Sequence, residues 1–194
     1  MTFVKEYLKE ISSVASLISE EDIEKVVEGL VYIRENGGRL FILGVGGSAA
    51  NASHATNDFR KIAGIEAYAP TDNVAEFTAR ANDEGWETTF EGFLKVSKLC
   101  NLDALLILSV GGGNLEKGIS VNLCKASDFA KNLGCKIYCI VGRHVGYVQV
   151  QADVSIHIPV PTPDFLTPIS ESFQAVVWHL LVSHPKLKVN ATKW

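Results

Sequence analysis

The chain has 194 residues, a formal net charge of −4, and 47% hydrophobic against 21% charged residues. A chain of this length can bury the core of one α/β domain, and the residue balance is ordinary for a globular protein. The mild negative charge, without any run of basic residues, argues against nucleic acid as a partner. No apolar run reaches the roughly 18 residues of a membrane-spanning helix, so we expect no membrane association.

The first predicted elements are two helices. Apolar residues recur at near-helical spacing over residues 3–18, and a second such pattern follows a capping sequence at 19–22 and ends at Gly37 and Gly38. Residues 1–37 therefore form a predicted helical hairpin, whose apolar face could pack on a partner chain as easily as on its own. We expect residues 1–194 to form a single domain, with an α/β core at 38–194.

Strands and helices then alternate. Apolar runs predict strands at 40–43, 65–69, 103–110, 136–141 and 154–158, and helices are predicted at 48–62, 73–80, 86–99, 114–132, 146–150 and 167–184. The strands are continuously apolar, which is typical of a parallel sheet covered on both faces. The predicted fold class is α/β, a three-layer doubly wound parallel sheet of about five strands.

The four cysteines are Cys100, Cys124, Cys135 and Cys139, and no two of them form a C-x-x-C pair. This pattern is typical of reduced, buried thiols rather than of disulfides or a zinc cluster. The N-terminal sequence MTFVKEYLKEIS carries charges every few residues and lacks the apolar core of a signal peptide. We therefore expect a cytoplasmic protein.

Three glycine-rich turns follow predicted strands and lead into helices: GVGGS at 44–48, SVGGGN at 109–114 and GRHVG at 142–146. Ligands of open α/β sheets bind at the carboxyl ends of the strands, where glycine permits close approach and a helix N-terminus offers free N–H groups. For any one turn, tight packing is the simpler explanation. The first two together, with hydroxyls at Ser48 and Ser109, favour phosphate binding.

Nucleotide-binding motifs fit these turns poorly. Ala49 stands where a dinucleotide fingerprint has its third glycine, and neither turn continues into the Gly-Lys-Ser/Thr of a P-loop. A nucleotide-binding protein is therefore a disfavoured alternative.

The segment GVGGSAANASHATNDF (44–59) resembles the G-N-G-G-S-A-x-x-A-x-H motif of the phosphoheptose isomerase branch of sugar isomerase (SIS) domains. The resemblance runs through most of the chain and includes ANDEGWE at 81–87 and the strand and turn at 103–114. It implies the SIS fold and conversion of sedoheptulose 7-phosphate to a glycero-manno-heptose 7-phosphate. It further implies a homotetramer with active sites between subunits and, as in many members, bound zinc.

Carried over residue by residue, the resemblance implies two sets of site residues. The substrate-binding set comprises Gly46, Gly47, Ser48, Asn82, Asp83, Ser109, Gly111, Gly112, Gly113 and Asn114. The metal-binding set comprises His54, Asp58, Glu171 and His179, of which the last three are also the candidate catalytic residues.

The sequence departs from the family pattern at four places. Val45 replaces the family's Asn, and the 109–114 loop keeps its backbone donors but loses hydroxyls. Asp58 stands for Glu, and Glu171 stands for Gln, so the metal set carries one more negative charge. That charge predicts a bound divalent metal, Zn²⁺ first, with Mn²⁺ or Fe²⁺ as alternatives. These changes are compatible with a phosphorylated sugar as the substrate class, but they leave the identity of the sugar open.

The spacing of the metal set has a geometric consequence. His54 and Asp58 are four residues apart on one helix face, which suits two ligands of one ion or a carboxylate that orients an imidazole. Glu171 and His179 are eight residues apart, roughly 12 Å along a helix. Either Glu171 lies at the mouth of its helix, or one of these two residues acts outside the metal shell or from another subunit.

Two classes of function follow. An aldose–ketose isomerase needs a base to move a proton between neighbouring carbons and an acid or metal to polarise the carbonyl. A non-catalytic phosphosugar-binding SIS module, a sensor or a protein partner, would keep the glycine turns and lose the acid–base set. Imidazoles and carboxylates fill the site positions here, which favours the enzyme.

Overall fold

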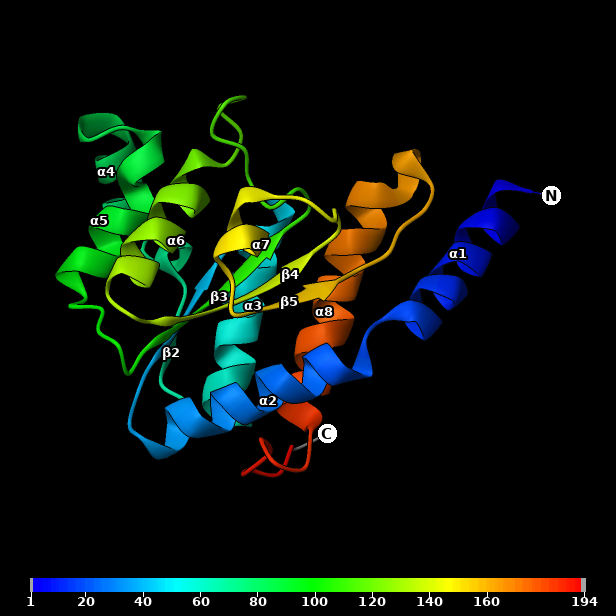
Figure 1. Cartoon of the computed structure of the whole chain (residues 1–194), viewed down its shortest axis with the longest axis horizontal. Helices are drawn as coiled ribbons and strands as arrows, with labels where there is room; N and C mark the ends of the chain where they lie inside the picture. The colour runs from blue at the N-terminus through cyan, green and yellow to red at the C-terminus, as the bar shows by residue number, and fades with distance from the viewer. Residues whose placement is uncertain (1, 193–194) are drawn as a thin grey trace.

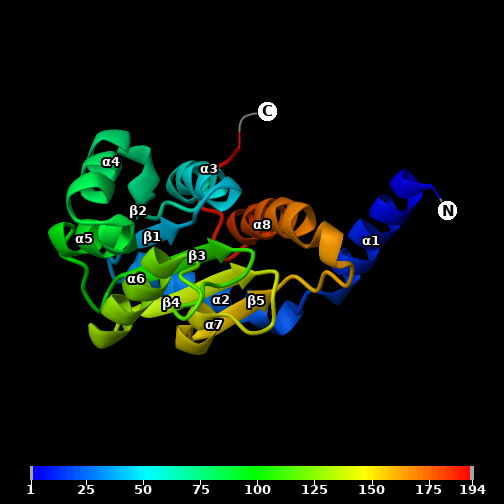
Figure 2. The same cartoon turned by 90° about the horizontal axis from the view of Figure 1, so that it is seen from above.

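A single parallel sheet organises the molecule. The structure, a computed structural model, describes residues 2–192. Its strands are β1 (Leu40–Leu43), β2 (Ala67–Tyr68), β3 (Ala104–Ser109), β4 (Lys136–Val141) and β5 (Val154–His157). They lie in the order β2-β1-β3-β4-β5, and every pairing is parallel. Helices cover both faces of the sheet (Figures 1 and 2), so the predicted doubly wound α/β fold is confirmed.

The helices divide between the two faces. Helices α2 (Glu20–Glu35), α3 (Gly47–Lys61) and α8 (Leu166–Ser183) pack in one apolar cluster, and α5 (Thr89–Val96), α6 (Val121–Asn132) and α7 (Tyr147–Gln151) pack in the other. Alternate strand residues point to opposite faces. Leu40 and Ile42 therefore enter the first cluster, and Phe41 and Leu43 the second.

The two predicted N-terminal helices are present, and they diverge. Helix α1 (Phe3–Leu17) extends away from α2 and from the body of the molecule (Figure 1). Its inner side packs on the loop before α8, where the Phe3 and Tyr7 rings meet Phe165 edge-on. Its outer side exposes Val4 and Leu8, each more than 60% accessible.

The loop before α6 corrects a predicted boundary. The sequence pattern predicts a helix over 114–132, but α6 begins at Val121. Residues 114–120 instead form a loop closed by an antiparallel bridge between Asn114 and Ile119. Gly118 and Ser120 adopt positive φ angles of 65° and 48°, which a helix does not accommodate.

The region between β2 and β3 also differs from the prediction. Strand β2 has two residues rather than five, and a 3₁₀ turn (Pro70–Asp72) follows it. Helix α4 (Val74–Asp83) runs three residues further than expected, and a second 3₁₀ turn (Trp86–Thr88) precedes α5. No helix within residues 2–192 has the length and hydrophobicity required to cross a bilayer.

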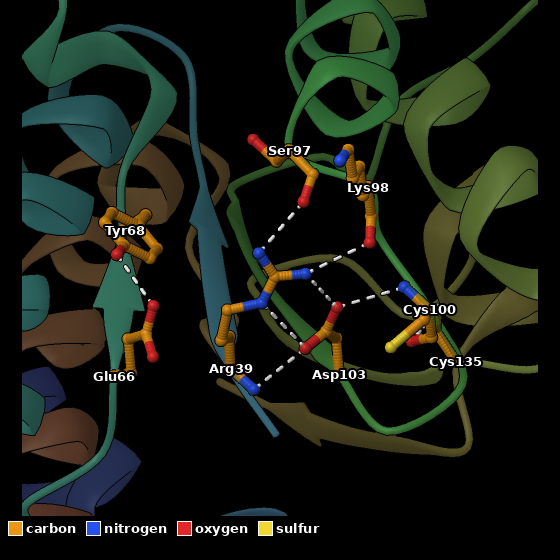
Figure 3. Close-up of polar contacts among 8 residues, drawn as sticks. All are labelled: Arg39, Glu66, Tyr68, Ser97, Lys98, Cys100, Asp103 and Cys135. Carbon is orange, nitrogen blue, oxygen red and sulfur yellow. Dashed lines mark hydrogen bonds and ion pairs between the residues drawn. The ribbon is translucent and has the colours of Figure 1, made fainter. Parts of the chain in front are cut away.

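The amino ends of β1 and β3 are joined by a buried ion pair (Figure 3). Asp103, 1% exposed, accepts hydrogen bonds from Arg39 Nε at 3.1 Å and Nη2 at 2.7 Å. It also accepts the backbone N–H groups of Arg39 and Cys100. Burial opposes ionisation, but these four donors outweigh it and hold the pKa of Asp103 below its usual value.

All four cysteines are free thiols. Cys124, Cys135 and Cys139 are buried, and burial raises their pKa values to about 11, 12 and 11, respectively. Cys100, expected to be buried, is exposed, because it lies at the surface turn that precedes β3.

Candidate functional site

The first two glycine turns lie at the same edge of the sheet. Strands β1 and β3 are parallel neighbours, with Leu43 opposite Ile107, so the turns that follow them lie side by side. Gly46 adopts a φ of +64° at the start of α3, a conformation that glycine takes without steric strain. The helix then presents its first N–H groups at this edge.

Ser48 is held by α8. Gln174 Nε2 donates to Ser48 Oγ at 3.0 Å, and Asn51 Nδ2 donates to Gln174 Oε1 at 2.8 Å and to the Glu171 carbonyl at 2.9 Å. Both Ser48 and Gln174 are buried. Because Ser48 Oγ serves as an acceptor in this network, its hydroxyl proton is available to a ligand.

The 109–114 loop directs carbonyls inward and N–H groups outward. The carbonyls of Gly112 and Gly113 accept the N–H groups of the first residues of α7, at 2.9 and 3.1 Å. Ser109 Oγ accepts the Gly112 N–H at 3.0 Å, so this hydroxyl shapes the turn. The N–H groups of Gly111 and Gly113 have no hydrogen-bond acceptor within residues 2–192. They are therefore free to bind an anion.

Close packing explains why glycine occupies position 112. Its φ is +70°, and a Cβ there would lie 2.9 Å from Gly146 Cα in the third glycine turn. The second and third turns thus pack backbone to backbone.

Three side chains converge where α3 and α8 run next to each other. His54 Nε2 lies 3.5 Å from Asp58 Oδ2, and His179 Nε2 lies 3.3 Å from the same oxygen. The candidate ligand atoms of the three residues all lie within 4.8 Å of one another. Ligands of a tetrahedral zinc ion lie roughly 3.4 Å apart, so this spacing fits one ion.

Hydrogen bonds orient these side chains. His179 Nδ1 lies 2.8 Å from the Ala175 carbonyl, which accepts a hydrogen bond from that N–H and leaves the Nε2 lone pair directed at Asp58. A lone pair that faces a carboxylate oxygen needs a cation or a proton between them. A backbone carbonyl on the opposite ring nitrogen is the usual support of a metal-binding histidine.

Neutral donors compensate the burial of Asp58, whose side chain is 6% exposed. Trp178 Nε1 donates to Oδ2 at 3.2 Å, and Asn57 Nδ2 donates to Oδ1 at 3.0 Å. The two imidazoles are about half exposed, and His54 and Asp58 line a pocket formed by the end of α3 and the C-terminal residues 191–192. The carboxylate is thus fixed, while the histidines remain accessible.

Glu171 lies apart from this group. Its carboxylate lies over Gly47, in the space that a Cβ of Gly47 would fill. Helices α3 and α8 run in the same direction, so Glu171 is placed near the start of α3 and His179 near its later turns. Glu171 is the sixth residue of the unbroken helix α8 and is not among the three grouped ligands, so the arrangement matches the second expected solution, in which one of the two residues lies outside the metal shell.

The remaining predicted substrate residues occupy separate places. Asn82 and Asp83 lie at the end of α4, and their side chains hydrogen-bond to each other at 2.7 Å. Asn114 Oδ1 accepts the Lys117 N–H at 2.7 Å and so supports the loop before α6. Within residues 2–192, these side chains make no hydrogen bond to the first glycine turn.

Comparison with known proteins adds a family to this geometry. The sequence model described as "SIS domain" matches residues 5–142. The phosphoheptose isomerase of Helicobacter pylori strain P12 is 33% identical over 162 residues, which cover 80% of this chain and 78% of that protein. The phosphoheptose isomerase of Aliarcobacter butzleri is 29% identical over 163 residues, 80% of this chain and 82% of its own. The chain belongs to the SIS domain family.

Solved structures share the fold of this SIS domain. The phosphoheptose isomerase of Neisseria gonorrhoeae superposes with a TM-score of 0.79 at 22% identity, over 93% of this chain and 92% of its own. The phosphoheptose isomerase of Francisella tularensis gives a TM-score of 0.78 at 22% identity, over 94% of this chain and 97% of its own. The resemblance to phosphoheptose isomerases inferred from the sequence is therefore confirmed.

Sequence reasoning overlooked three residues of the site in this SIS domain. Trp178 donates to Asp58 from 120 positions away, and Asn51 and Gln174 connect α3 to α8 beside Ser48. One signal could have found Gln174, because it lies three residues after Glu171 and so shares its helix face. Nothing in the sequence pairs Trp178 with Asp58.

Proposed function

We propose that this SIS domain is an aldose–ketose isomerase of a phosphorylated sugar. The observation that carries the proposal is the placement of two kinds of group along α3. Free N–H donors lie at its start, beside the 109–114 loop, and the His54–Asp58–His179 cluster lies further along the same helix. One substrate could thus have its phosphate held at one end and its reacting carbons presented to acid–base groups.

The phosphate end is assigned to backbone donors. The N–H groups of Gly111 and Gly113, the first N–H groups of α3 and the Ser48 hydroxyl supply neutral donors, and the dipole of α3 adds a positive potential. Gly46 and Gly111 leave room for close approach, because a Cβ at either position would meet nothing within 4 Å. Asn82 and Asp83 stay a proposal as sugar-hydroxyl ligands.

His54, Asp58 and His179 are proposed to hold a divalent metal, Zn²⁺ first. The spacing of the three ligand atoms and the support of His179 by a backbone carbonyl fit such an ion. When bound, the metal would polarise the substrate carbonyl. Asp58 supplies the negative charge of this site, and the half-exposed imidazoles leave a side open to substrate.

Glu171 is proposed as the group that moves the proton. Its carboxylate lies over Gly47, at the first glycine turn, rather than among the candidate metal ligands. Position thus separates its role from that of Asp58. Without a bound metal, His179 is the candidate acid, and Asp58 is the alternative base.

The substrate class follows from distance. Six residues separate Ser48 from His54, roughly 9 Å along the helix axis. This separation favours a long, open-chain sugar phosphate over a three-carbon one. Sedoheptulose 7-phosphate is the first candidate, because the most similar relatives reported above are phosphoheptose isomerases.

The test is a panel of C5 to C7 sugar phosphates followed by NMR. We expect interconversion of a ketose and an aldose phosphate, fastest for a seven-carbon sugar, with loss of turnover after treatment with a chelator and recovery on adding Zn²⁺. Thermal stabilisation by a sugar phosphate without turnover of any of them would instead support the non-catalytic binding module. Stabilisation by nucleotides alone would support neither.

Replacing Glu171 by Gln tests the proton-transfer role. The amide keeps the shape but cannot take a proton, so we expect kcat to fall by roughly 10²–10⁴, with KM changed little and metal content unchanged. Gln174→Glu is unsuitable as a control because it would place a charge in the core, so Glu28→Gln, an exposed change on α2, serves instead. Loss of metal from E171Q would make Glu171 a ligand, and unchanged kcat would remove it from catalysis.

Assembly and compartment are part of the same proposal. The outer side of α1 exposes Val4 and Leu8 on a helix that extends from the body (Figure 1), which suits burial against another copy. We propose a homotetramer of single-domain chains in the cytoplasm, as the family resemblance implies.

A further inference from the structure

A second pocket lies beyond the third glycine turn, at the carboxyl ends of β4 and β5. It measures about 590 Å³ and is lined on one side by Arg143, His144 and His157, and on the other by Leu17, Leu166 and a proline-rich segment at 159–163. None of its lining residues is Asp or Glu. The pocket therefore combines cationic or protonatable groups with an apolar wall and contains no counter-charge of its own.

Arg143 has no acidic partner. Within residues 2–192, its guanidinium makes neither an ion pair nor a hydrogen bond, and its side chain is exposed. Its backbone is fixed, however, because the Val110 carbonyl accepts the N–H groups of both Gly142 and Arg143 at 3.1 Å. This arginine is thus attached directly to the 109–114 loop and keeps a planar set of donors free.

The two histidines stack on each other. Their ring centroids are 3.6 Å apart, and His157 Nε2 lies 3.2 Å from the Gly142 carbonyl, which accepts a hydrogen bond from its N–H. Burial, and then the neighbouring His144, lower the pKa of His157. Two stacked imidazolium rings would repel each other, so an anion near them would stabilise a positive charge on the exposed ring of His144.

An unpaired polar atom lies at the same wall. Ser170 Oγ is fully buried, lies against Gly142 and has no hydrogen-bond partner within residues 2–192. Buried hydroxyls are normally hydrogen-bonded, so this unpaired hydroxyl is an unusual feature behind Gly142, although Ser170 does not itself line the pocket.

We propose that this pocket is a second anion site that takes a phosphate monoester, with Arg143 and His144 on the phosphate and the apolar wall against the rest of the ligand. Arg143 supplies a fork suited to phosphate oxygens. The ligand is either the second phosphate of a molecule bound at the 109–114 loop or a separate phosphorylated metabolite. The site does not depend on isomerase activity.

Histidine NMR spectra with inorganic phosphate as the probe test this site. H144Q and H157Q assign the two ring signals, and we expect phosphate to shift both in the unmodified protein. In R143Q the midpoint of that shift should rise roughly tenfold or more, because a charge-assisted hydrogen bond is lost. K98Q removes one exposed charge at the opposite edge of the sheet and should behave as the unmodified protein.

Either of two results would overturn the site. One is that phosphate leaves the His144 and His157 signals in place at concentrations that shift the amides of Gly111 and Gly113. The other is that R143Q and K98Q share one midpoint, with amide spectra that show both to be folded. Turnover enters neither result, so failure of this site and failure of the isomerase proposal are distinguishable.

A second titration identifies the source of the phosphate. If one ligand spans both places, a sugar bisphosphate shifts the histidine signals and the loop amides together, and more tightly than a sugar monophosphate does. If the ligand is separate, inorganic phosphate and a sugar monophosphate shift the histidine signals and the loop amides with independent midpoints, and a sugar bisphosphate binds no more tightly than a sugar monophosphate. In R143Q the histidine response should weaken in both cases, and a bisphosphate response that is unchanged in R143Q would contradict the proposal.

Discussion

Replacing Asp58 by Asn is expected to abolish metal binding and to lower kcat at least about 10³-fold. Asp58 Oδ2 is the atom that His54 and His179 share, at 3.5 and 3.3 Å. Asn keeps the shape and the hydrogen bond from Trp178 but removes the only charge among the three candidate ligands. Metal per chain by elemental analysis and steady-state kinetics are the measurements.

The control is Asp164→Asn, which removes one exposed carboxylate from the turn before α8 and should retain full metal content. Combining His54→Gln with Asp58→Asn leaves one imidazole, so the double variant should contain no metal at all. Unchanged metal stoichiometry in the double variant would show that the metal binds elsewhere and would remove these three side chains as its site.

The outcome also decides between two readings of the His179 ring. Because Nδ1–H donates a hydrogen bond to the Ala175 carbonyl, Nε2 faces Asp58 either through a metal or through a second proton. A bound metal would act here as a Lewis acid, whereas a protonated His179 ring would act as a general acid. Both would act on the same carbonyl, so Glu171 keeps its proposed place in either case.

The parts of the fold that could be predicted are those that the local sequence determines. Strand β4 lies at residues 136–141 as expected, because a continuous apolar run ends at Gly134 on one side and Gly142 on the other. Helix α6 starts seven residues later than predicted. Its leading residues favour a helix by composition, but the left-handed conformations at Gly118 and Ser120 are set by the bridge between Asn114 and Ile119.

The candidate site shows the same division between local and distant information. The i, i+4 spacing of His54 and Asp58 placed them together correctly, because one helix contains both. The contribution of Trp178 required the packing of α3 on α8, which no local pattern encodes. The eight-residue spacing of Glu171 and His179 showed that they lie far apart along one helix. The place of the Glu171 carboxylate, over Gly47, could be seen only in the structure.

Replacing Asp103 by Asn is expected to lower the free energy of unfolding by about 3 kcal/mol at pH 7, the largest stability change among these predictions. The change removes the charge that faces Arg39 while leaving the guanidinium in place (Figure 3). Arg39 also donates to the carbonyls of Ser97 and Lys98, at 2.9 and 3.1 Å, so the turn before β3 should loosen with it. Urea unfolding followed by circular dichroism measures the difference.

The pH dependence of that difference has a definite sign. Because the folded-state pKa of Asp103 lies below its unfolded value, the ion pair contributes fully above the unfolded pKa of about 4 and is lost as pH falls through the folded pKa. The difference in unfolding free energy between the unmodified protein and D103N should therefore be constant from pH 5 to 7 and become smaller below pH 4. Asp153→Asn breaks the exposed pair with Lys136 and should change stability by less than about 1 kcal/mol. A loss of unfolding free energy in D103N that is no larger than that in D153N, or that increases in acid, would show that the buried ion pair does not hold β1 to β3.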